Sequence, residues 1–173
     1  MKEDLSIISA NKKFVPVEEA EKIILSQRKD FGIEAISFRD AVGRVLAQDI
    51  TADRDLPPFN RVAMDGIAIH YEAFEKGIRT FKIKSIQAAG EEPIDIIAID
   101  ECIEIMTGAA LPKTTDTIIR YEDLEINEGI AILKTEDINK GQHVHWKGSD
   151  KNKNGILINA NCIVTPSMIS VAA

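Results

Sequence analysis

The strongest constraint on the fold is a run of short strand-like segments that begins near Thr51. Several of them alternate apolar and polar residues, as half-buried strands do, and they read GIAIHY, TFKIKSIQAA, ECIEIMT, DTIIRYEDLEI and GIAILKTED. Gly, Pro, Asn and Asp separate the segments, and the turn at 127–129 is typical of a hairpin. Only residues 71–77 read as a brief helix. The sequence therefore predicts a mainly antiparallel, β-rich region over residues 51–140.

The residues on either side of this region favour helices. In PVEEAEKIILSQRKDFG, Pro16 suits the first helical position, acidic residues fall in the first turn and basic residues in the last, and Gly32 can close the helix. A second, short helix is expected over 38–42. Thr165 and Pro166 form a helix start close to the last residue of the sequence, so we expect a longer protein that continues beyond this point.

Composition excludes several classes of protein. The formal net charge is -7, with 21 basic and 28 acidic residues, which argues against general nucleic-acid binding because that needs a basic surface. No run approaches the roughly 20 apolar residues of a membrane helix. Cys102 and Cys162 have no metal-site or disulfide spacing, so they are expected to be buried free thiols. Free thiols and the lack of a signal peptide predict a cytoplasmic protein.

The segment DLPPFNRVAMDGIAIH contains the first candidate site residue. Pro57 and Pro58 exclude a helix interior or a central strand, so the segment is expected to be a rigid, exposed connector. Gly66 allows close backbone approach or a positive φ. A carboxylate at Asp65 would stand on a stiff support at the mouth of the β region, which suits a polar site. The alternative is that Asp65 caps a turn.

The segment IEIMTGAALPKTTDTIIRYE contains the second candidate, at the end of a predicted strand. The hydroxyl of Thr107, beside Gly108, can bind an oxyanion or the edge of a phosphate. Alternatively, it satisfies the backbone of the turn. The sequence has no phosphate-binding P-loop, dinucleotide-binding, nucleophile-elbow or zinc-protease motif. The residues alone therefore give candidate polar groups without a complete catalytic set.

The segment HVHWKGSD gives the third set of candidates. His143 and His145 would share one face of an extended chain, but no third ligand follows at a recognisable metal-site spacing. Lys147 could meet an anionic ligand or be an ordinary solvated lysine. Asp150 is either a loop carboxylate or a functional one, and the spacing does not decide between them.

Several motifs together resemble the N-terminal half of the molybdopterin molybdenumtransferase family, the MoeA-type proteins that include the gephyrin E domain. They stand here, in the family's order, as VEEAEKIIL, AVGRVLAQDI, PPFNRVAMDGIA, IMTGAALP and, more loosely, GQHVHWKGSD. The resemblance implies an α+β, mostly β fold. Residues 1–50 and 141–173 would form an elongated, dimerising region, and 51–140 an inserted β-barrel-like domain. The family's downstream pterin-binding domain is absent from this sequence.

The resemblance also implies a function. Such proteins insert molybdate into adenylylated molybdopterin, with Mg²⁺ and loss of the nucleotide, and they work as homodimers without nucleic-acid or membrane partners. We expect this chain alone to be inactive. The alternatives are a dimerisation or scaffold module without catalysis and a degenerate paralogue of the same fold.

The resemblance assigns roles to individual residues. It implies that Asp65, Thr107 and Asp150 are catalytic, with Asp65 and Asp150 orienting the metal or the nucleotide-pterin ligand and Thr107 donating to an oxyanion. Asp65 is also the expected metal ligand, since carboxylates suit Mg²⁺. The residues expected to contact the cofactor or substrate are Met64, Gly66, Gly108 and Lys147.

Five positions depart from the family pattern. Asn60 replaces Asp, Val62 replaces Ser, Ile67 replaces Tyr, His145 replaces Arg and Ser149 replaces Glu. Losing Arg, Glu and Asp together would remove charges that contact an anionic, metal-bearing ligand. The departures therefore predict a divergent member of the family with weakened or altered activity.

Overall fold

A computed structural model describes residues 14–172. Contacts divide the chain into two compact units, Met1–Asp40 and Ala41–Ala173. In the first unit, helix α1 covers Val17–Ser26 and a 3₁₀ turn covers Phe38–Asp40. The sequence predicted a longer first helix, closed by Gly32. Instead α1 ends early, because polar side chains satisfy backbone groups locally: Ser26 Oγ donates to Ile23 O at 2.7 Å, and Gly32 N–H donates to Asp30 Oδ1 at 2.8 Å.

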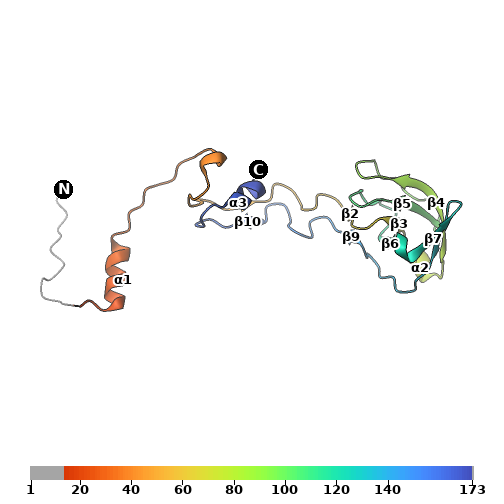
Figure 1. Ribbon diagram of the computed structural model, residues 1–173, viewed down its shortest axis with the longest axis horizontal. Coiled ribbons are helices and arrows are strands. Elements are labelled where there is room, and N and C mark those ends of the chain that lie inside the picture. The colour runs from red at the N-terminus through yellow and green to blue at the C-terminus, as the bar shows by residue number, and fades with distance from the viewer. Residues whose placement is uncertain (1–13, 173) are drawn as a thin grey trace. The chain divides into compact units, whose positions relative to one another are not determined.

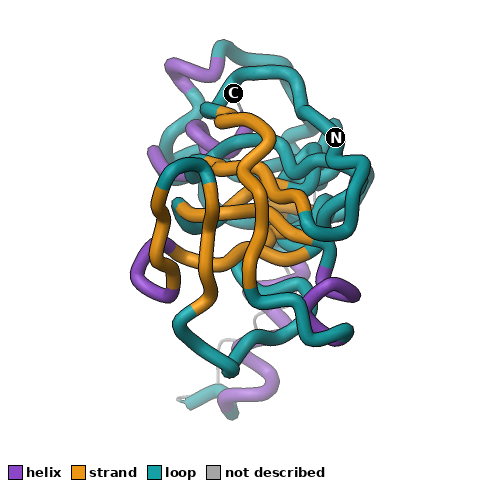
Figure 2. The backbone as a smooth tube through the Cα atoms, turned by 90° about the vertical axis from the view of Figure 1, so that its right-hand side faces the viewer, coloured by secondary structure: helices purple, strands orange, loops and turns teal. Residues whose placement is uncertain are grey.

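The second unit contains a six-stranded sheet in the order β6-β3-β5-β4-β8-β7 (Figure 1). β4 and β5 pair in parallel, whereas the other pairs are antiparallel. A parallel pair needs a long crossover, which the loop at 88–100 provides. Figure 2 shows the strands of this curled sheet in orange. Their bounds are β3 Gly66–Ile69, β4 Thr80–Gln87, β5 Glu101–Ile105, β6 Thr117–Arg120, β7 Leu124–Asn127 and β8 Ile130–Leu133.

Both faces of the sheet are buried at β3, which has no exposed residue. Ile67 and Ile69 point into one core cluster, and Ala68 into the other, as the two-residue period of a strand requires. The first cluster packs against side chains of helix α2, Tyr71–Glu75. Cys102 is buried in this cluster as predicted, and burial raises the pKa of its thiol to about 12. Cys162 is only half-buried, because it lies outside the sheet.

The structure confirms the predicted elements that depend on nearby turn and cap residues. β7 and β8 form the predicted hairpin, with positive φ at Glu128 (49°) and Gly129 (78°). The brief helix predicted over 71–77 is α2. A second 3₁₀ turn, Tyr121–Asp123, joins β6 to β7. Helix α3, Pro166–Ala172, follows Thr165, whose Oγ1 accepts from Met168 N–H at 3.4 Å.

The two segments that lead into and out of the sheet run side by side as a narrow antiparallel ladder (Figure 1). β1, Ile50–Thr51, pairs with β10, Ile156–Ile158, and β2, Arg61–Val62, pairs with β9, Val144–His145. A bridge between Leu56 and Lys151 lies between these two pairs. The α+β, mostly β fold class is thus confirmed, while the proposed boundaries at 51 and 141 stay a prediction. No helix over residues 14–172 is both long and apolar enough to cross a membrane.

Candidate functional site

Three sequence motifs that are far apart in the chain form adjacent extended segments. On one side of the connector that carries Asp65, the segment 107–111 runs antiparallel to it. Leu111 N–H donates to Asn60 O at 2.9 Å, Val62 N–H to Ala109 O at 3.0 Å, and Gly108 N–H to Val62 O at 2.9 Å. These bonds bring IMTGAALP beside PPFNRVAMDGIA, which sequence order alone does not reveal.

The segment 143–150 lies along the other side of the connector. Ala63 N–H donates to His143 O at 2.9 Å, and Gly148 N–H donates to Pro57 O at 3.0 Å. This pairing buries Pro57, although Pro58 remains exposed. The connector was predicted to be exposed throughout; the returning segment covers part of it. Three of the five motifs that carry the resemblance, one of which is the connector itself, therefore lie side by side.

Asp65 and Thr107 are in direct contact. Thr107 N–H donates to Asp65 Oδ1 at 2.6 Å, and both residues are exposed. Thr107 lowers the pKa of the Asp65 carboxyl, first through this N–H and then through its hydroxyl. Asp65 does satisfy a backbone amide, as the turn-cap alternative proposed, but the amide belongs to a residue 42 positions away. The result is an ionised, exposed carboxylate held at the point where β3 begins and β5 ends.

The neighbours of Asp65 have structural reasons for their identity. A Cβ on Gly66 would lie 1.9 Å from Ile119 O, so only glycine permits the close approach of β3 to β6. Gly108 has φ +90°, and its N–H belongs to the ladder with Val62. Met64 is 37% exposed and is open to a ligand. Contact of these three residues with a cofactor stays a prediction.

Sequence reasoning missed Glu104 and Tyr121, which lie beside Asp65. Tyr121 O–H donates to Glu104 Oε1 at 2.6 Å, and Tyr121 N–H donates to Asp65 O at 3.2 Å. Burial, then the bond to Glu104, raises the pKa of the Tyr121 phenol. A signal was present in ECIEI: Glu104 stands two residues after the buried Cys102, on the same face of β5. A carboxylate at a core-facing strand position indicates a special environment.

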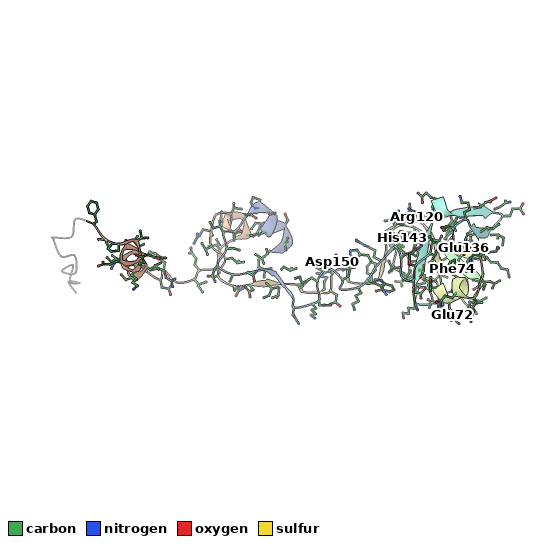
Figure 3. All side chains as sticks on the ribbon, turned by 90° about the horizontal axis from the view of Figure 1, so that it is seen from below. Glu72, Phe74, Arg120, Glu136, His143 and Asp150 are labelled. Atoms are coloured by element: carbon green, nitrogen blue, oxygen red, sulfur yellow. The ribbon has the colours of Figure 1, made fainter. Side chains whose placement is uncertain are left out.

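Asp150 lies on the ladder, apart from the Asp65–Thr107 contact. Its N–H donates to Leu56 O at 2.9 Å, and Figure 3 shows it some way along the chain from His143. Its Oδ1 lies 2.7 Å from His145 Nε2, and His145 Nδ1 lies 3.0 Å from an Nη2 of Arg61. The structure thus joins Asp150 to a second polar group rather than to Asp65.

Lys147 is already paired. Its Nζ lies 3.5 Å from Asp55 Oδ2, and its N–H donates to Asn60 Oδ1 at 3.0 Å. The N–H of Lys153, followed by Lys147, lowers the pKa of Asp55. Asn60, one of the departures from the family pattern, therefore links the connector to the returning segment.

Nothing within residues 14–172 forms a metal site of three or more His, Cys, Asp or Glu side chains. His143 has φ 58°, outside the extended conformation that would align it with His145, and His145 is occupied by Arg61 and Asp150. Magnesium is commonly bound by one or two carboxylates together with waters and substrate phosphates. A site of that kind also needs the substrate, so Asp65 as a metal ligand stays a prediction.

Comparison with known proteins identifies the class to which this fold and these motifs belong. Residues 15–173 match the model of the MoeA N-terminal region (domain I and II). The chain therefore belongs to the MoeA family through that region. The solved structure of the molybdopterin biosynthesis MoeA protein from Pyrococcus horikoshii OT3 matches with a TM-score of 0.80 and 29% identity, over 92% of this chain and 43% of that one.

Curated relatives give the name of the enzyme that carries this region elsewhere. A molybdopterin molybdenumtransferase from Synechocystis sp. is 34% identical over 148 residues, which are 85% of this chain and 38% of the relative. One from Staphylococcus aureus is 26% identical over 164 residues, covering 92% of this chain and 39% of the relative. The chain thus spans about two fifths of the length of the relatives it matches.

Proposed function

We propose that this chain forms the N-terminal, cleft-lining part of a molybdopterin molybdenumtransferase, which inserts molybdate into adenylylated molybdopterin during molybdenum cofactor biosynthesis. One observation carries the proposal. The Asp65 carboxylate is exposed and fixed by Thr107 where three of the motifs of the resemblance run side by side. A polar group held still on a rigid support is what a site needs to orient a ligand.

The geometry divides the roles between Asp65 and Thr107. Thr107 N–H donates to Asp65 Oδ1 at 2.6 Å and holds this oxygen in place. We therefore assign Thr107 to positioning the carboxylate, beside the oxyanion role that the resemblance implies. Asp65 is then the group that meets the ligand, either directly or as one of the carboxylates that Mg²⁺ accepts beside substrate phosphates. The cytoplasmic location and the homodimer implied by the resemblance belong to the same proposal.

The test is a fusion in which this chain replaces the matching part of the Synechocystis molybdenumtransferase. We expect the fusion to insert molybdenum, and Asp65→Asn to lower its turnover roughly 100-fold, because the oriented charge is lost. The free energy of unfolding should change by less than about 1 kcal/mol, as at other exposed positions. Asp53→Asn is the matched control, since Asp53 is an exposed aspartate just before the connector, bonded to Arg54. An Asp65→Asn fusion that keeps normal turnover would contradict the proposal.

The isolated chain should give no turnover with molybdate, adenylylated molybdopterin and Mg²⁺. The reason is that it matches only about two fifths of the length of the active relatives. The assay is release of the nucleotide by the purified 173-residue chain, with the fusion as the positive control. Robust release by the chain alone would show that this region contains a complete active site.

A specific observation favours the scaffold alternative as a second candidate. Helix α1 has no buried residue, and it exposes apolar side chains such as Val17 (79%) and Ile24 (70%). Exposed apolar patches mark surfaces that contact another protein or another part of the same protein. If the chain self-associates in analytical ultracentrifugation and the fusion folds but is inactive, assembly is the better description of its function.

A further inference from the structure

A line of three polar side chains crosses the ladder away from the Asp65–Thr107 contact. Arg61 and His145 are directly opposed residues of β2 and β9. Arg61 Nη2 lies 3.0 Å from His145 Nδ1, and His145 Nε2 lies 2.7 Å from Asp150 Oδ1. The line therefore has a guanidinium at one end, a carboxylate at the other and an imidazole between them.

The chemistry of the two outer groups decides where the imidazole proton lies. A guanidinium donates hydrogen bonds and cannot accept them, so His145 Nδ1 must be the acceptor from Arg61. A neutral imidazole has one N–H, which must then be on Nε2. Nε2–H donates to Asp150, whose ionised carboxylate only accepts. Arg61 thus determines, through His145, which hydrogen bond Asp150 receives.

Asp150 is held at two points as a result. Its backbone N–H donates to Leu56 O at 2.9 Å, and its Oδ1 accepts from His145. The side chain is nevertheless 59% exposed, so the carboxylate remains accessible to a ligand while its orientation is fixed. An exposed aspartate without such a partner would rotate among its staggered conformations.

We propose that Arg61 and His145 form a positioning pair, which orients Asp150 toward a hydrogen-bond donor or hydrated cation of the ligand; this role rests on the proposed function. The sequence predicted that the site loses a positive charge, because His145 stands where the family has Arg. The pair changes this expectation. The guanidinium is supplied instead from the neighbouring strand, and the imidazole connects it to Asp150. Arg61 and His145 then act as one unit.

The first test uses the 173-residue chain itself and does not depend on activity. Nitrogen NMR of the imidazoles at about pH 8 should show a single His145 proton, on Nε2. Arg61→Met should move the Nδ1 resonance toward that of an unbonded imidazole nitrogen. Arg54→Met is the matched control, because Arg54 is an exposed arginine bonded to its neighbour Asp53, and it should leave His145 unchanged. A proton on Nδ1, or an Nδ1 resonance indifferent to Arg61→Met, would overturn the pair.

The second test measures the role of the pair in the Synechocystis fusion. Arg61→Met and His145→Leu should each lower kcat about 10-fold, the lower end of the effect of removing a supporting hydrogen bond. The double variant should be no worse than the more affected single variant, because residues that act as a unit are not additive. Effects that multiply, or single variants with normal kcat, would refute the positioning role. If the unmodified fusion is inactive, the proposed function fails, and the NMR result alone decides whether the pair exists.

Discussion

Gly66→Ala should lower the free energy of unfolding by about 3 kcal/mol, or abolish folding, because the introduced methyl has no room. The new Cβ would lie 1.9 Å from Ile119 O, 2.8 Å from Ile119 C and 2.9 Å from Arg120 Cα. These are backbone atoms of β6, so no side-chain rotation can relieve the clash. β6 would have to leave β3, breaking the pairs Gly66–Arg120 and Ile67–Ile119. Urea unfolding followed by circular dichroism measures the effect.

The control for this variant is Gly129→Ala. Gly129 has φ +78°, so alanine is strained there, but nothing lies within 4 Å of the added Cβ. Left-handed strain alone costs about 1 kcal/mol. Gly66 also has a positive φ, +158°, so the difference between the two variants reports the close approach of β3 to β6 together with the difference in backbone strain. Equal losses would mean that backbone conformation, and not the neighbouring strand, requires glycine at position 66.

The sequence predicts the local elements of this fold well, because local chemistry determines them. The hairpin at 127–129 follows from the positive φ that Gly129 accepts, and helix α3 follows from the cap supplied by Thr165. Helix α1 is the exception. The basic residues Arg28 and Lys29 and the stop signal Gly32 predicted a later end, but the hydrogen bond from Ser26 Oγ to Ile23 O competes with further helix. An argument from such end signals does not weigh this bond.

Without the family resemblance, the sequence does not predict which distant strands pair. The parallel pairing of β4 with β5 depends on the crossover at 88–100, which has no sequence pattern of its own. The same limit applies to the candidate site. Asp65 and Thr107 are each suggested by their local motifs, but their contact spans 42 positions and arises only when β3 pairs with β5. Motifs therefore identify candidate groups, and the sheet decides which of them meet.

A buried side-chain amide, Gln87, helps to hold the segment that carries Thr107, although it belongs to none of the motifs. Gln87, at the end of β4, is fully buried. Its Nε2 donates to Ala110 O at 2.7 Å, and its Oε1 accepts from Ile94 N–H at 3.2 Å. Ala110 lies opposite Arg61 in an isolated bridge, so Gln87 anchors the segment that runs along the connector. Both polar ends of this side chain are satisfied, as burial requires.

Gln87→Glu should destabilise the chain by roughly 3–5 kcal/mol at pH 7, since it buries a carboxylate whose second oxygen faces Ala110 O. Burial raises the pKa of the introduced carboxyl in the folded chain above the value of about 4.3 expected when unfolded. Between those two pKa values the folded state binds more protons, so the free energy of unfolding rises as the pH falls. The loss should therefore be largest above the folded pKa and should shrink toward pH 5. Urea unfolding across this pH range, expressed as a difference from the unmodified chain, measures it.

Gln87→Leu is the control, because it removes both hydrogen bonds of the side chain without adding a charge. It leaves Ala110 O and Ile94 N–H without their partner and should cost about 2 kcal/mol at every pH. The pH-dependent part of the Gln87→Glu loss thus reports the buried charge, and the Gln87→Leu loss reports the missing hydrogen bonds. If Gln87→Glu shows no pH dependence beyond that of Gln87→Leu, the carboxyl has reached water. The end of β4 would then be more open than the zero exposure of Gln87 indicates, and the 107–111 segment would need another anchor.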